Sequence, residues 1–265
     1  METWITIMKM TVYQFKFVLA LALAMVLASL PSKAQDGPMT ASSGAEKAIS
    51  LGVEADMNSQ YIWRGIVFES SPVIQPSVWV SVRSLTLSVW NSHAPRRETG
   101  VGIGDEVDFM LTHEHDWQLV SSEFEFGYYV YPGDDESPST GELTASFSRS
   151  VGLLSASTRH TFDILEYRGS YYGEASLSVE HDAAYGLNFE TRAFTGWASA
   201  EFNEAYACVS HSALNLAGLE AAVTVRIAGP LYVRPHVETY FTLNRIIAEA
   251  TQHRVTSAGL AFGVD

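Results

Sequence analysis

Cys208 is the only cysteine in the chain, so the sequence excludes an internal disulfide framework and a cysteine-based zinc site. Charged residues are also scarce, at 17%, and Asp and Glu outnumber Lys and Arg by 30 to 16, which gives a net charge of −14. A nucleic-acid partner is not expected, because phosphate binding requires a basic surface. Hydrophobic residues reach 47% and aromatic residues 12%, so a disordered chain is excluded as well.

The longest apolar run is confined to the start of the chain. Lys9 and Lys16 precede the apolar stretch 17–30 (FVLALALAMVLASL), and residues 32–34 (SKA) have the small-x-small pattern of a cleavage site. The stretch is shorter than the roughly 20 residues of a spanning helix, so a single-span anchor is the weaker alternative. Residues 1–34 are therefore predicted to be a signal peptide.

The rest of the chain divides into a linker and one domain. Residues 35–47 (QDGPMTASSGAEK) are small and polar and are predicted to be a periplasmic linker before a barrel over residues 48–265. Loss of residues 1–34 removes three lysines and Glu2, which takes the net charge from −14 to −16. No later stretch approaches 18 consecutive apolar residues, so no transmembrane helix is expected there.

From residue 48 onward the dominant sequence period is two. Such alternation predicts strands with one apolar and one polar face, whereas a helical period competes only weakly, at 198–208 and 245–250. Twelve segments show the alternation: 49–58, 74–83, 85–90, 106–112, 123–130, 142–147, 154–163, 171–180, 187–197, 219–226, 231–241 and 256–264.

The connections between these segments alternate between short turns, such as 83–84, and long polar loops, such as 198–212. That habit is typical of outer-membrane barrels, and an even strand count places both ends on the periplasmic side. An exported β-sandwich shows the same alternation and is the weaker alternative. The sequence thus predicts an all-β fold, a transmembrane antiparallel up-and-down β-barrel of about 12 strands. Aromatic residues near the long-loop ends are expected to form an interfacial girdle: Tyr61, Trp63, Tyr128, Tyr171 and Trp197.

Several short motifs resemble one known family. They are SQYIWRG at 59–65, PVIQP at 72–76, and GYYVYPG at 127–133, which follows an acidic strand. Over about residues 50–180 the chain resembles the TorF-like porins of bacterial outer membranes. The resemblance implies a barrel in that membrane and says less about the solute.

Charged residues on the polar strand faces are the candidate functional residues. A turn at 115–116 predicts that Asp108 faces Glu123 and that Glu106 faces Glu125, and like charges placed opposite each other need cations. The patch is either a cation-selective constriction or part of an arginine–carboxylate network that closes the lumen. The lumen candidates are Arg64, Glu106, Asp108, Glu123, Glu125, Arg159, Arg192, Arg226 and Arg234.

Other candidate sites are weaker. Trp79 and Trp90 fall on the polar face and are candidate aromatic contacts for a sugar or nucleobase, although simple packing is favoured. Residues 113–116 (HEHD) resemble metal ligands but are better explained as interfacial residues. No catalytic motif is present, so neither an enzyme, a metal site nor a cofactor is predicted, and a rim hydrolase has little support.

The predicted function is a porin-like channel in the bacterial outer membrane. It would pass small hydrophilic solutes or ions by passive diffusion and lean toward cations, with outer-membrane lipid, lipopolysaccharide and the barrel-assembly machinery as further partners. The alternative is a non-conducting structural or adhesive barrel with a closed, salt-bridged lumen.

Overall fold

The computed structural model describes residues 49–95, 105–132, 134 and 137–265. The predicted signal peptide (1–34) and the predicted linker (35–47) both lie outside the described residues. No helix among the described residues is long and apolar enough to cross a membrane.

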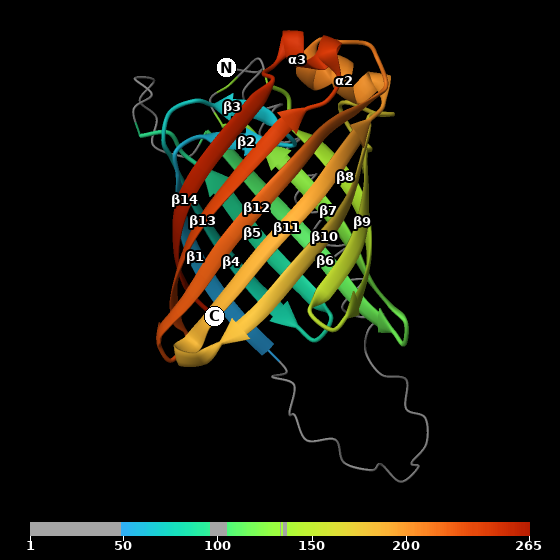
Figure 1. Ribbon diagram of the computed structural model, residues 1–265. Coiled ribbons are helices and arrows are strands. Elements are labelled where there is room, and N and C mark those ends of the chain that lie inside the picture. The colour runs from blue at the N-terminus through green and yellow to red at the C-terminus, as the bar shows by residue number, and fades with distance from the viewer. Residues whose placement is uncertain (1–48, 96–104, 133, 135–136) are drawn as a thin grey trace, which may run out of the picture. The chain divides into compact units, whose positions relative to one another are not determined.

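Twelve antiparallel strands close into a barrel, as predicted (Figure 1). β1 pairs with β4 on one side and with β14 on the other, so the sheet that forms the barrel has no free edge. The barrel strands are β1 (Ile49–Asn58), β4 (Val73–Val82), β5 (Leu85–Ser92), β6 (Glu106–Trp117), β7 (Val120–Val130), β8 (Thr140–Val151), β9 (Leu154–Asp163), β10 (Tyr171–Ala183), β11 (Leu187–Ala198), β12 (Ala213–Ala228), β13 (Leu231–Thr242) and β14 (Arg254–Val264).

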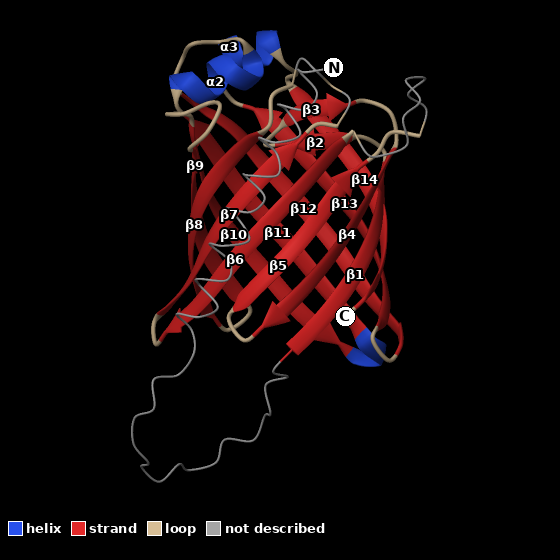
Figure 2. Cartoon of the chain, turned by 180° about the vertical axis from the view of Figure 1, so that it is seen from behind, coloured by secondary structure: helices blue, strands red, loops and turns tan. Residues whose placement is uncertain are grey.

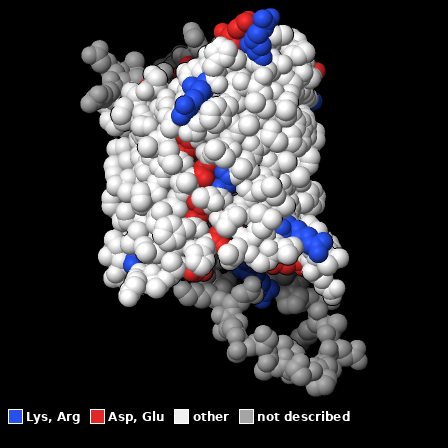
Figure 3. Space-filling model, in the orientation of Figure 1, with Lys and Arg blue, Asp and Glu red and all other residues white. Residues whose placement is uncertain are grey.

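The two faces of the barrel wall follow the sequence alternation. In β1, Leu51 and Val53 project outward and are 64% and 47% exposed, while Glu54 and Asp56 alternate with them and bond to β13 side chains inside. In Figure 3 the outer wall is mostly uncharged, apart from a narrow central seam and residues near the two ends. Apolar side chains therefore face outward and charged ones inward, which is the arrangement of a membrane-spanning barrel.

The two ends of the barrel differ in their connections (Figures 1 and 2). Tight turns join strands at the end where the C-terminus lies, and one of them contains the short 3-10 helix η1 (Ala184–Gly186). The opposite end, here called the loop end, carries α2 (Ala200–Ala207), α3 (Arg245–Ala250), and the strands β2 (Tyr61–Trp63) and β3 (Ile66–Glu69). The two weak helical patterns of the sequence are thus confirmed as α2 and α3.

The side chains that start the two helices are capping residues. Ser199 accepts a hydrogen bond from the backbone of Phe202 at the start of α2, and Asn244 accepts from the backbones of Ile246 and Ile247 at the start of α3. α2 ends at Cys208, which has a left-handed backbone with φ of 55°. These local signals explain why short helices interrupt a chain dominated by strands.

The predicted register between β6 and β7 is wrong. Asp108 lies opposite Tyr129, and Thr112 lies opposite Glu125. The reason is that β6 continues through Trp117, so the chain turns at residues 118–119 and not at 115–116. One like-charged pair nevertheless occurs in this hairpin, because Glu114 faces Glu123.

The predicted aromatic girdle is only partly present. Tyr171 and Trp197 occupy neighbouring outward positions at the loop end, where the indole nitrogen donates to the tyrosine oxygen over 3.0 Å. Tyr61 and Trp63 do not belong to the wall, because both lie on the short β2–β3 pair. At the turn end, Trp117 is 60% exposed on the outer face.

Glycines on the inner wall make room for aromatic rings from the neighbouring strand. A Cβ atom added at Gly52 would lie 2.0 Å from the indole of Trp79, directly across β1 and β4. A Cβ atom at Gly218 would lie 2.1 Å from the ring of Phe194, directly across β11 and β12. Such pairs fix the register by shape and fill the glycine gaps in the wall.

Candidate functional site: the lumen and its inserted hairpin

The connection between β1 and β4 folds into the barrel as a small hairpin, here called the inserted hairpin (59–72). β2 and β3 pair with each other and with no wall strand. Arg64 and Gly65 form the tip with φ values of 51° and 79°, a left-handed conformation that glycine adopts readily and arginine rarely. The tip is therefore held in place by its surroundings and not by local preference alone.

Apolar contacts anchor one side of the inserted hairpin. Ile62 is buried in a cluster with side chains from four consecutive wall strands, β11 to β14: Phe194, Leu216, Tyr240 and Val255. Val67 packs against the same cluster. An apolar core thus lies inside the loop end of the barrel, where the strand pattern by itself predicts a polar lumen.

Helix α2 covers the other side of the inserted hairpin. The Trp63 ring stacks on Phe202 with centroids 5.7 Å apart and meets Tyr206 edge-on at 4.8 Å. Phe202 also packs against Tyr172 of β10. These rings join the hairpin, the helix and the wall into one aromatic cluster.

Arg64 carries the strongest polar contact of the hairpin. Its guanidinium donates two hydrogen bonds to Glu142 of β8, at 2.8 and 2.6 Å. The guanidinium carbon also lies 4.1 Å from the Trp63 ring centroid and 4.9 Å from that of Tyr172. Burial tends to lower the pKa of Arg64, but Glu142 more than offsets this, so the pKa is raised and the charge is retained.

Polar and aromatic contacts complete the seating of the hairpin. The Tyr61 hydroxyl hydrogen-bonds Glu106 of β6, and its ring lies 5.5 Å from that of Trp90 on β5. The Gln60 amide donates to the backbone of Thr256 on β14 over 2.7 Å. The hairpin therefore touches β5, β6, β8 and β10 to β14, and it spans the lumen near the loop end.

A cavity of about 400 Å³ opens between the inserted hairpin and the loops, and it is called here the upper cavity. Its aromatic lining consists of Tyr61, Phe68, Tyr131, Tyr167 and Tyr206. Its acidic lining consists of Glu69, Asp105, Glu106 and Asp134, and the described lining includes no Lys, Arg or His. The upper cavity is therefore both aromatic and acidic.

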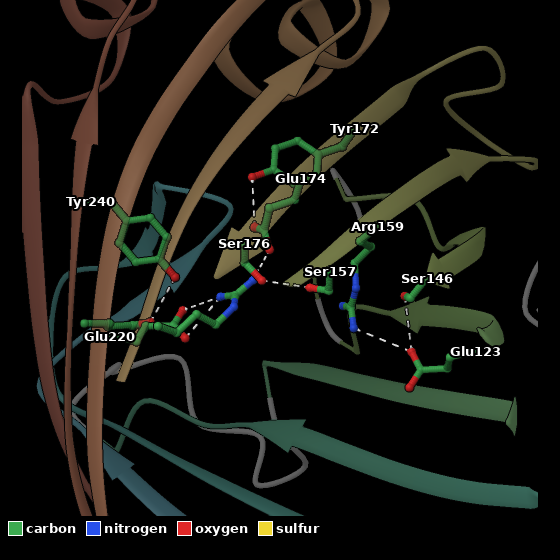
Figure 4. Close-up of polar contacts among 11 residues, drawn as sticks. Glu123, Ser146, Ser157, Arg159, Tyr172, Glu174, Ser176, Glu220 and Tyr240 are labelled. Carbon is green, nitrogen blue, oxygen red and sulfur yellow. Dashed lines mark hydrogen bonds and ion pairs between the residues drawn. The ribbon is translucent and has the colours of Figure 1, made fainter. Parts of the chain in front are cut away.

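The lumen on the turn side of the hairpin has a different character. A cavity of about 600 Å³ is lined by five carboxylates and by Arg159 and Arg192, and is called here the middle cavity. Arg192 bonds to Glu174 and also to Glu220, the latter at 3.0 Å, while Arg159 lies 3.6 Å from Glu123 (Figure 4). Arg192 thus bridges acids on β10 and β12, the two strands beside its own, whereas Arg159 pairs with one acid on β7.

The turn end holds a third cavity of about 570 Å³, in which acids and arginines are again mixed. Arg234 donates to Glu54 over 3.1 Å, and the hydroxyl of Tyr232 donates to the same carboxylate over 2.6 Å. Arg226 pairs with Asp265 over 2.8 Å at an exposed position. Beside this group, His236 contacts Asp56 over 2.9 Å.

The structure groups the predicted lumen residues by depth. Eight of them project inward from wall strands, whereas Arg64 reaches the lumen from the inserted hairpin. Glu106 and Asp108 lie near the hairpin, while Glu123 lines the middle cavity. Glu125 accepts a 3.2 Å hydrogen bond from Thr112 and lies between these levels.

The two candidate tryptophans face the interior, but the rings of both pack against other residues of the protein. Trp79 covers Gly52, and Trp90 packs against Tyr61 of the inserted hairpin. The candidate set omits Glu142 and Tyr172, both of which contact Arg64. It also omits the acids that pair with the other arginines: Glu54, Glu174 and Glu220. The same alternation that selects the other lumen residues places Glu142 on the polar face next to Leu143.

Asp108 is unusual among the lumen carboxylates. It is 6% exposed, and its Oδ1 atom has no hydrogen-bond partner. Burial disfavours the charged form of the Asp108 carboxyl, and the negative charges of Glu106, Glu142 and Glu125 disfavour it further.

No group of three or more His, Cys, Asp or Glu side chains in the described part of the chain could hold a metal ion. His113 and His115 lie on the outer face of β6 near a tight turn, and the ring of His115 meets Trp117 edge-on at 4.2 Å. The absence of catalytic activity, inferred from the sequence, stays a prediction.

No protein-family model matches the chain, and no curated protein matches it either. Among solved structures it is similar to the KdgM porin in complex with disordered oligogalacturonate, with a TM-score of 0.48, 8% identity, and coverage of 81% of this chain and 98% of that one. The NanC porin gives a TM-score of 0.48 and 8% identity, with coverage of 82% and 100%. The COG4313 outer membrane channel from Pseudomonas putida F1 gives 0.46 and 11%, with coverage of 87% and 99%. These likenesses are confined to the barrel architecture.

Proposed function

We propose that the protein is an outer-membrane channel for passive diffusion of small hydrophilic solutes or ions, with a preference for cations. The observation that carries the proposal is a lumen with polar cavities on both sides of the inserted hairpin, each lined by more carboxylates than arginines. Acidic side chains in a narrow, low-dielectric passage attract cations and repel anions. The lipid, lipopolysaccharide and assembly-machinery partners follow from the membrane location, and the export signal and TorF-like family assignment remain part of the proposal.

The proposal assigns selectivity to the acidic face of β6 and β7. Glu106 and Asp108 lie beside the inserted hairpin, and Glu125 and Glu123 continue the series toward the middle cavity. A cation that moves along this wall meets one carboxylate after another. Arg64 and Arg159 limit the preference, because they neutralise Glu142 and part of the charge at Glu123.

A second function is favoured by one specific observation. The inserted hairpin contacts eight wall strands and buries Ile62 in an apolar cluster, which suits a plug as well as a constriction. A barrel that stays closed at this level would be a structural or adhesive protein whose arginines and carboxylates stiffen the wall.

Planar-bilayer recording of the refolded full-length chain separates the two functions. A channel gives discrete conductance steps and a reversal potential of cationic sign in a KCl gradient. Neutralisation of four lumen carboxylates by E106Q, D108N, E123Q and E125Q should move that potential toward zero. The matched control neutralises four exposed carboxylates of the loop end: Glu166, Glu201, Glu204 and Glu249. Unchanged ion selectivity in the lumen variant would contradict the proposed cation preference. The absence of any conductance in the wild-type protein would favour the closed barrel.

A further inference from the structure

The upper cavity differs from the other two lumen cavities in a way that points to a ligand. The two cavities on the turn side are each lined by two arginines, and each of these arginines pairs with at least one carboxylate. In the upper cavity the described lining has four carboxylates, five aromatic rings and no basic side chain. A concave site of this size and composition suits a small molecule and not merely a stretch of wall.

The tyrosines are arranged around one carboxylate. The hydroxyls of Tyr61 and Tyr131 both hydrogen-bond Glu106, one from the inserted hairpin and one from the start of the loop after β7. A carboxylate has about four acceptor positions, so these two bonds orient Glu106 and still leave it able to accept further donors. The Tyr167 and Tyr206 rings lie 5.2 Å apart and line the same cavity.

A second, independent observation indicates the charge of the missing partner. Asp108 lies two residues beyond Glu106 on the same inward face of β6, outside the lining of the upper cavity, and its buried Oδ1 atom has no hydrogen-bond partner. Buried carboxylates are normally paired or hydrogen-bonded, because isolated burial of a charge is costly. The negative charges of Glu106, Glu142 and Glu125 repel that of Asp108. Arg64 pairs with Glu142, so a cation near Glu106 would offset part of the remaining repulsion.

We propose that the upper cavity binds small organic cations, with an ammonium group held by Glu106 and surrounded by tyrosine rings. The faces of aromatic rings attract ammonium ions, and nearby carboxylates add charge attraction. A chelated divalent metal fits less well, because Ca²⁺ and Mg²⁺ require more oxygen ligands than any cluster of described residues offers. Acidic sugars are disfavoured by the four carboxylates, and a neutral sugar stacked on the rings is the competing occupant.

This inference rests on the proposed cation-leaning channel, because it identifies the class of cation that the loop end would admit. Binding is therefore measured without conduction, by titration calorimetry of the refolded full-length protein in detergent. The probes are choline and 3,3-dimethylbutan-1-ol, which has the same shape but no charge. We expect choline to bind at least about tenfold more tightly than the uncharged analogue, as a cation–aromatic contact reinforced by charge allows.

Variants locate the bound probe. E106Q should weaken choline binding about tenfold, and Tyr131→Leu should weaken it more than Tyr131→Phe, which keeps the ring. Glu249→Gln removes an exposed charge of the same loop end outside the cavity and should leave binding unchanged. Heat-modifiable gel migration of every variant shows that the barrel is still folded.

Three outcomes overturn the inference: no choline binding to the wild-type protein, equal binding of choline and its uncharged analogue, or an undiminished affinity in E106Q. Tighter binding of maltose than of choline also overturns it and assigns the cavity to a neutral sugar. Choline binding by a protein that never conducts keeps this site and rejects the channel, whereas conduction without binding does the reverse.

Discussion

The guanidinium of Arg64 and the carboxylate of Glu142 meet through two hydrogen bonds, of 2.8 and 2.6 Å, although 78 positions separate them in the chain. The contact joins the tip of the inserted hairpin to β8 across the lumen. Glu142 also accepts a 2.9 Å hydrogen bond from Tyr129, so its charge is paired on two sides. This ion pair holds the inserted hairpin in the lumen, together with the apolar contacts of Ile62.

We predict that Arg64→Ala frees the inserted hairpin and raises the single-channel conductance. The substitution leaves Glu142 buried without its cation, which costs about 3–5 kcal/mol and favours a displaced hairpin that admits water. Planar-bilayer recordings measure the conductance, and urea unfolding in detergent measures the loss of stability.

The matched control is Arg226→Ala, which breaks an exposed ion pair with Asp265 at the turn end. We expect it to change the single-channel conductance and the stability only slightly. An Arg64→Ala protein with wild-type conductance and wild-type stability would contradict the assigned role of the pair.

Asp108→Asn is expected to stabilise the barrel by about 1 kcal/mol, since it removes a charge from a buried carboxylate group and keeps the side-chain shape. The urea midpoint, followed by tryptophan fluorescence in detergent micelles, is the measurement. Asp116→Asn, at an exposed position of the same strand, serves as the control and should shift the midpoint little. A clear loss of stability in Asp108→Asn would contradict the assigned cost of burying this charge.

Gly218→Ala should destabilise the barrel by about 1–3 kcal/mol, because the new methyl group would collide with the ring of Phe194 on the neighbouring strand. The double variant Phe194→Ala with Gly218→Ala removes the ring that causes the collision. A double-mutant cycle from urea unfolding should therefore give a coupling energy well above zero. Additive effects in the cycle would mean that the two positions do not form the tight pair described here.

The membrane assignment predicts a simple gel behaviour. The folded protein should need detergent for extraction, and unheated samples should migrate faster than heated ones, because a closed barrel resists unfolding by detergent until it is heated. Comparison of paired heated and unheated lanes after refolding provides the measurement. A protein that stays soluble and monodisperse without detergent would be inconsistent with an apolar outer wall in lipid.

Much of the fold can be predicted from the sequence because the information is local. Alternation over 49–58, for example, decides which side chains share a face, and a strand imposes that period wherever it occurs. The same rule predicts twelve strands, the polar lumen and the inward direction of residues such as Arg192 and Arg234. The helical patterns near 198–208 and 245–250 also depend on residues close in the chain.

Other features depend on contacts between distant residues. The register of β6 against β7 is decided by where the turn falls, and a shift from 115–116 to 118–119 exchanges every facing pair. The insertion of 59–72 has no strong local signal, because the wall residues that bury Ile62 come from the distant strands β11 to β14. The sequence predicts that Arg64 lies in the lumen, but it does not predict that Arg64 reaches the lumen from an inserted hairpin.

The sequence by itself determined the period of the strands and hence an apolar outer face, a polar inner face and an acidic charge balance. The tertiary structure alone decided that one connection enters the lumen, that Arg64 meets Glu142 there, and that aromatic and acidic side chains gather in the upper cavity. The physical reason is that periodicity is a property of neighbouring residues along one chain segment. Pairing across a closed barrel depends instead on shape, charge and burial among segments that only folding brings together.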